Sequence, residues 1–94
     1  MLEIIQKQSN ELQLSGRFDA SQAEKALQVL SVQTESVVID MSELDYISSM
    51  GLGVLIQTFK RLEQSGHTLK LKNLNNHIRD VFKYTRLDQV MEII

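Results

Sequence analysis

The sequence has 94 residues, enough for one domain, and its 43% hydrophobic and 23% charged content is typical of a folded protein rather than a disordered chain. It contains no cysteine, which excludes disulfides, thiolate metal sites and thiol nucleophiles, and no stretch approaches the roughly 20 apolar residues of a membrane span. The net charge of −2 is unevenly divided, because residues 1–47 carry three basic and eight acidic residues whereas residues 48–94 carry seven basic and four acidic ones.

This charge division is compatible with orientation toward a charged partner, but a solvated surface on each side is the preferred interpretation. Nucleic-acid binding is not indicated, because the basic residues lack the interleaved aromatic residues that stack on bases. Met1 is not followed by the basic and apolar regions of a secretory signal, so we expect a cytoplasmic protein.

The first two predicted elements are strands. Leu2–Ile5 is apolar, and Glu11–Ser15 alternates strictly between polar and apolar residues, which is typical of a half-buried strand. The polar segment Gln8–Asn10 between them predicts a hairpin, and Gly16 is predicted to end the second strand.

A helix is predicted next. Asp19 is suited to be its N-cap, and Gln22 three residues later completes a capping-box pattern. The apolar residues then recur at helical spacing: Ala20, Ala23, Ala26, Leu27 and Leu30. The β-branched run Val37–Ile39 predicts a short strand covered on both faces.

The second half of the sequence repeats the alternation of helix and strand. A helix is predicted over 49–65 and ends before Gly66, and a strand follows over 69–72. Asn75 or Asn76 is suited to cap a third helix, and the apolar end of the chain predicts a terminal strand or a final apolar tuck. Strands that alternate with helices predict a single α/β domain over 1–94, with a mixed, largely parallel sheet of four to five strands and helices packed on it.

The segment from Asp40 to Gly53 is the most distinctive part of the chain. A buried strand is predicted to lead into a polar loop, which enters the second helix through Ser48 and Ser49. Functional groups of open α/β sheets gather at the carboxyl ends of strands, and a helix start tolerates a phosphate because its N–H groups are unpaired. The alternative interpretation is an N-cap that contributes about 1 kcal/mol, which periodicity alone favours.

A helical wheel of the second helix suggests a docking surface beside the two serines. Leu52, Leu55 and Phe59 belong to the stripe that faces the core. The opposite stripe is predicted to face outward, and its members are Met50, Val54, Gln57 and Arg61. Methionine adapts to irregular partners, so an exposed Met50 and Val54 would suit a protein interface.

These residues together resemble the STAS domain, in the single-domain form found among bacterial anti-sigma factor antagonists. Leu14–Asp19 looks like the family's strand-to-helix turn, and Val37–Ser42 looks like its hydrophobic strand followed by D-x-S. Asp45–Leu52 looks like the family's phosphorylation loop and helix start. The resemblance covers essentially the whole chain.

The resemblance implies a partner switch. In such proteins, an anti-sigma factor serine kinase of the GHKL type phosphorylates a serine at the position of Ser49, and a PP2C-type phosphatase reverses the reaction. The dephosphorylated antagonist binds the kinase and frees the sigma factor. Ser48 stands where the family often has Asp, which leaves Ser48 as the alternative site. The residues expected to contact the partner are Asp45, Ser48, Met50, Gly51, Val54, Gln57 and Arg61.

Other functions have weaker support. Neither His67 nor His77 is tied by a motif to a nucleophilic serine, so we expect no enzyme activity. No cofactor or metal is expected, because dinucleotide, P-loop and EF-hand patterns are all incomplete. The remaining alternative is a STAS subunit that is never phosphorylated and belongs to a larger assembly, such as a lipid-transport ATPase or a stress-signalling complex.

Overall fold

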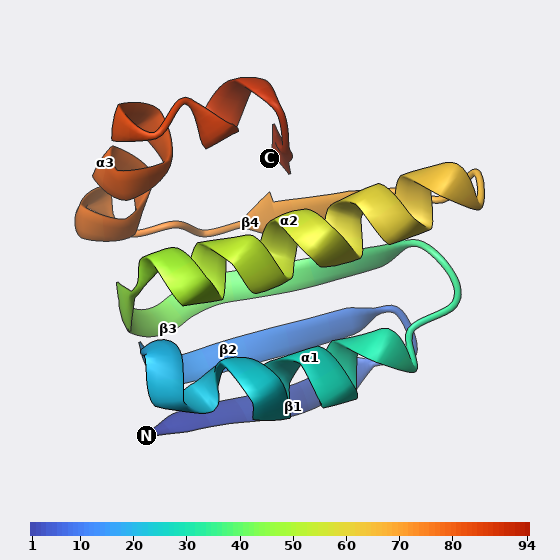
Figure 1. The fold of residues 1–94 in the computed structure, drawn as a ribbon, viewed down its shortest axis with the longest axis horizontal. Helices are drawn as coiled ribbons and strands as arrows, with labels where there is room; N and C mark the ends of the chain where they lie inside the picture. Colours follow the sequence, from blue (N-terminus) through green and yellow to red (C-terminus); the bar gives the residue numbers. More distant parts are fainter.

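Strands and helices alternate along the chain in the computed structural model, which describes residues 1–94 (Figure 1). The strands are β1 (Leu2–Gln8), β2 (Glu11–Phe18), β3 (Val37–Ile47), β4 (Leu69–Lys72) and β5 (Glu92–Ile93). The α-helices are α1 (Ala23–Ser31), α2 (Ser49–Gln64) and α3 (Asn76–Tyr84). Two short 3-10 turns, Ala20–Gln22 and Leu87–Gln89, precede α1 and β5.

All five strands form one sheet in the order β1-β2-β3-β4-β5. The hairpin of β1 and β2 is antiparallel, whereas every later neighbour is parallel and is reached through a helix. The predicted α/β class and the mixed, largely parallel sheet are therefore confirmed. The terminal segment forms a fifth strand, because Glu92 and Ile93 pair with Lys70 and Leu71 of β4.

Helices α1 and α2 lie side by side over one face of the sheet (Figure 1). Leucines at alternate positions of the strands are buried, as in Leu12 and Leu14 of β2 and in Leu69 and Leu71 of β4. The opposite face is polar: the Lys72 ammonium lies 3.0 Å from the Glu11 carboxylate. The prediction that Val37–Ile39 is covered on both faces was wrong, since Val38 is only half-buried.

Two local predictions in the first half were also wrong. Gly16 does not end its strand, because β2 continues to Phe18 with Gly16 at φ +93°, where a Cβ would lie 2.2 Å from the Met1 carbonyl oxygen. Asp19 is an N-cap as predicted, but of the 3-10 turn that leads into α1, and its carboxylate accepts the N–H of Ser21. The capping box does not form, because the Gln22 side chain accepts the N–H of Leu2 instead.

The segment 40–47, predicted as a polar loop, is the second half of the long strand β3. Its register with β2 shifts twice, so that eight residues of β2 face ten residues of β3 between the pairs Glu11–Val38 and Phe18–Ile47. Each shift is a β-bulge, and the extra residues interrupt the alternation of side chains. The strand therefore carries a run of polar residues without leaving the sheet.

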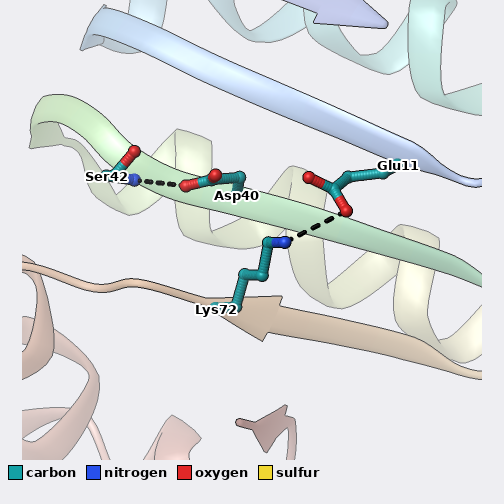
Figure 2. A network of polar contacts seen from close by, with 4 residues as sticks. All are labelled: Glu11, Asp40, Ser42 and Lys72. Carbon is teal, nitrogen blue, oxygen red and sulfur yellow. Dashed lines mark hydrogen bonds and ion pairs between the residues drawn. The ribbon is translucent and has the colours of Figure 1, made fainter. Parts of the chain in front are cut away.

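Asp40 anchors the first bulge (Figure 2). Its carboxylate is buried and accepts the N–H of Ser42 at 2.9 Å. Burial works to raise the pKa of Asp40, but hydrogen bonds from Ser42 and Asn73 and the nearby charge of Lys72 outweigh burial, and the pKa lies below its ordinary value. Figure 2 also shows Lys72 reaching Glu11 across β3, which ties β4 to β2 on the open face.

Candidate functional site

The candidate site lies where α2 begins, beside the carboxyl ends of β2 and β3 (Figure 1). The backbone N–H of Ser48 donates to the Phe18 carbonyl at 2.9 Å, which fixes the entrance of α2 against the end of β2. Ile47, the last residue of β3, pairs with Phe18 and is buried. The site is thus held by backbone contacts between the ends of two strands and the start of a helix.

The two serines at this helix start have different roles in the fold. Ser48 is the N-cap: its backbone is extended, and its hydroxyl accepts the N–H of Gly51 at 3.1 Å. Ser49 is the first helical residue, is exposed, and has a hydroxyl that takes part in no hydrogen bond. Ser48 therefore acts as the N-cap of α2, and the adjacent Ser49 carries the hydroxyl that is available for modification.

Gly51 sits on the buried side of the helix start. A Cβ added there would lie 2.9 Å from Ile47 Cγ1, 3.0 Å from the Phe18 carbonyl oxygen and 3.1 Å from Phe18 Cδ1. These distances are shorter than ordinary van der Waals contacts, so only glycine allows α2 to approach the strand ends this closely. Gly51 was predicted to contact a partner, but in this structure it is a packing residue of the core.

The predicted outward stripe of α2 is divided between core and surface. Met50 is 56% exposed and Gln57 is exposed, but Val54 is only 6% exposed, so the prediction that Val54 faces outward was wrong. The reason is that α2 packs on α1 as well as on the sheet, and a helix with two contact surfaces buries a wider arc. Arg61 is half-buried, and its guanidinium donates to the Leu30 carbonyl near the end of α1 at 2.9 Å.

A hollow of about 420 Å³ lies between α1 and α2 beside the serines. It brings together four of the singled-out residues of α2, namely Ser49, Met50, Val54 and Gln57. Its other lining residues are Gly53 of α2 and Ala23, Glu24 and Leu27 of α1. These four residues were not among the predicted site residues.

Asp45 lies apart from this hollow. It is the extra residue of the second bulge, between Leu44, which pairs with Gly16, and Tyr46, which pairs with Arg17. Its side chain is exposed at the carboxyl end of β3, two residues before Ile47. Asp45 therefore shares the edge of the sheet with the serines but does not line the space between the helices.

The charges around the helix start are mixed. Arg17 stacks its guanidinium over the Tyr46 ring, 4.3 Å from the ring centroid, at the ends of β2 and β3. The hydroxyl and the N–H of Ser21 hold the pKa of Asp19 below its ordinary value, with a contribution from the charge of Arg17. Asp19 therefore carries a negative charge directly after the end of β2.

The side chains of the chain provide no cluster of three or more histidine, cysteine or acidic residues that would hold a metal ion. None of the helices combines the length and the apolar character needed to cross a bilayer.

Comparison with known families gives one match that spans nearly the whole chain. The family model described as "Mlab, STAS domain" matches residues 3–94. Among curated proteins, the chain is 34% identical to the anti-sigma-B factor antagonist of Listeria monocytogenes, over 98% of this chain and 86% of that protein. It is 30% identical to the anti-sigma-B factor antagonist of Bacillus subtilis, over 95% of this chain and 86% of that protein.

Solved structures share the fold. An anti-sigma factor antagonist from Mycobacterium paratuberculosis superposes with a TM-score of 0.82 at 19% identity, and covers 99% of this chain and 83% of that one. A chain of the Acinetobacter MlaFEDB complex superposes with a TM-score of 0.69 at 22% identity, over 92% of this chain and 95% of that one. At these identities, the superpositions establish the architecture alone.

Proposed function

The chain belongs to the STAS domain family, and we propose that it is an anti-sigma factor antagonist controlled by phosphorylation of Ser49. In its dephosphorylated form it binds an anti-sigma factor serine kinase of the GHKL type, and so releases the sigma factor. A PP2C-type phosphatase restores that form. The protein works by binding rather than by catalysis, and it works in the cytoplasm.

One observation supports this assignment above the others: Ser49 is exposed, has a free hydroxyl and stands at the mouth of a hollow between two helices. A kinase can reach that hydroxyl without breaking any hydrogen bond of the fold. A phosphate on Ser48 would instead remove the cap that accepts the Gly51 N–H. Ser49 is therefore the preferred site, and Ser48 remains the alternative.

The position of Ser49 also explains how a phosphate acts without unfolding the domain. The first N–H groups of α2 and the helix dipole favour negative charge at this end, so the phosphorylated protein keeps its fold. The phosphate adds nearly two negative charges beside Glu24 and Met50, which line the same hollow. A docked partner has to desolvate that dianion, and binding is lost unless a matched cation faces it.

The test uses a purified GHKL-type anti-sigma factor kinase from the same organism. Kinase and ATP should add one phosphate to the wild type, located on Ser49 by peptide mass spectrometry, and none to Ser49→Ala. Ser49→Asp should bind the kinase at least about tenfold more weakly in calorimetry, which corresponds to about 1.4 kcal/mol, with an unchanged far-UV CD spectrum.

Ser9→Asp is the matched control, because Ser9 is an exposed serine in the hairpin turn, at the far end of β2 from the site. It should bind as the wild type does. Phosphate found on Ser48, with binding disrupted only by Ser48→Asp, would overturn the choice of serine.

A constitutive STAS subunit of a larger assembly is the second candidate, favoured by the description of the matching family model. It predicts no phosphate on either serine and stable co-purification with a transport ATPase. The mass-spectrometric experiment therefore separates the two functions.

A further inference from the structure

The hollow beside Ser49 continues along the two helices. A second hollow of about 200 Å³ follows it and shares Leu27 of α1 and Gln57 of α2 with the first. The second hollow is completed by Ser31, Thr58 and Arg61. Together the two form one groove between α1 and α2, which we call the α1–α2 groove, with Ser49 at one end and Arg61 at the other.

Gly53 lines this groove, and no contact within the domain requires a glycine at this position. It lies inside the exposed surface of α2, where glycine is among the least favourable residues for a helix. A Cβ at this position would meet no atom within 4 Å, in contrast to Gly51, where three atoms stand in the way. The missing side chain leaves a bare stretch of helix backbone in the wall of the groove.

We propose that the α1–α2 groove holds a helix of the partner kinase, which crosses α2 closely at Gly53. This inference rests on the proposed function, because the kinase must occupy the mouth of the groove to reach Ser49. Two neighbouring helices on a sheet present the kind of channel into which a third helix packs, and a residue without a side chain allows the closest crossing. Twelve residues separate Ser49 from Arg61, so the groove follows about 18 Å of α2, or about three helical turns.

The two ends of the groove carry opposite charges. Glu24 lines the end near Ser49, and Arg61 lines the far end, where the Leu30 carbonyl holds its guanidinium in place. The docked helix should therefore place an acidic residue near Arg61. At the other end of the groove, a phosphate on Ser49 adds to the negative charge of Glu24, and the docked helix offers no cation matched to it.

The experiment fills the groove at Gly53. Gly53→Leu should weaken binding of the same GHKL-type kinase at least tenfold in calorimetry and slow phosphate incorporation into Ser49. Gln64→Leu places the same side chain on an exposed position of α2 that lines neither hollow, and it should bind within twofold of the wild type. Gly53→Ala should raise the denaturation midpoint and weaken binding by a smaller factor than Gly53→Leu.

The outcomes separate this inference from the function on which it rests. If the wild type neither binds the kinase nor receives phosphate, both are overturned. If Ser49 is phosphorylated and Gly53→Leu, folded by far-UV CD, binds like Gln64→Leu, the switch stands and the groove is not the docking site. If the wild type sediments as a dimer that Gly53→Leu dissociates without changing kinase binding, the occupant is a second copy and the proposal is wrong.

Discussion

Replacing Gly51 or Gly53 by alanine should change stability in opposite directions, although the two residues lie in the same helix. Alanine is about 0.5–1 kcal/mol better than glycine within a helix. At Gly53 the new methyl group meets nothing within 4 Å, so the variant should gain about that amount. At Gly51 the methyl group would lie 3.0 Å from the Phe18 carbonyl oxygen, which already accepts the N–H of Ser48.

That oxygen cannot move away freely, because it holds the entrance of α2 to the end of β2. Overpacking of this kind costs about 1–3 kcal/mol, more than the gain in helix propensity. Gly51→Ala should therefore lose about 1–2 kcal/mol, and the two variants should differ by about 2 kcal/mol. In a domain of this size each 1 kcal/mol shifts Tm by about 4–8 °C.

Urea unfolding followed by far-UV CD measures both variants against the wild type, and the m-value checks that the unfolded states are comparable. An increase in stability for both variants would show that the start of α2 has room to relax away from Phe18. A decrease for both would show that Gly53 does serve an internal packing role, which would also remove the main support for the groove as a docking site.

Three further predictions follow from the same structure. Ser48→Ala should lower the free energy of unfolding by about 1 kcal/mol in urea titrations, because the cap of α2 is lost. Ser49→Ala should change that free energy by less than about 0.5 kcal/mol, and the reverse ranking would contradict the assignment of Ser48 as the cap. The ionised Asp40 carboxylate should stabilise the fold fully above its unfolded pKa of about 3.9, and this stabilisation should disappear as the pH falls through the lower folded pKa. The difference in unfolding free energy between the wild type and Asp40→Asn should therefore shrink below about pH 4. Val54→Ala should lose about 2 kcal/mol as a core truncation, and a loss near zero would restore Val54 to the surface.

The fold class could be predicted because it follows from the spacing of hydrophobic residues and from the order of strands and helices along the chain. The alternation in Glu11–Ser15 and the helical stripe from Leu52 to Leu62 are both present in the structure, and strands separated by helices require parallel neighbours. The cap of α3 was also predicted, since Asn75 accepts the Ile78 N–H. These features depend on local chemistry, which a single sequence displays directly.

The second half of β3 was missed because bulges disturb the signal by which strands are recognised. Asp40 and Met41 are both buried and Ser42 and Glu43 are both exposed, so the two-residue period fails there. The buried carboxylate of Asp40 is satisfied by the N–H of Ser42, and the sequence does not show which groups will meet. The burial of Val54 was missed for a related reason. It depends on how α1 and α2 lie beside each other on the sheet, which the sequence of α2 alone does not show.

The location of Ser49 depends on the same long-range features. Without the two bulges, Ile47 would extend two residues beyond Phe18, and the backbone bond between Ser48 and Phe18 would not form. Gly51 then brings α2 close enough for Ser48 to be used as the cap, which leaves the next hydroxyl free at the mouth of the groove. The structure therefore supports the proposal of Ser49 over Ser48 in one respect: the Ser48 hydroxyl is used as the cap of α2, whereas the Ser49 hydroxyl takes part in no hydrogen bond of the fold.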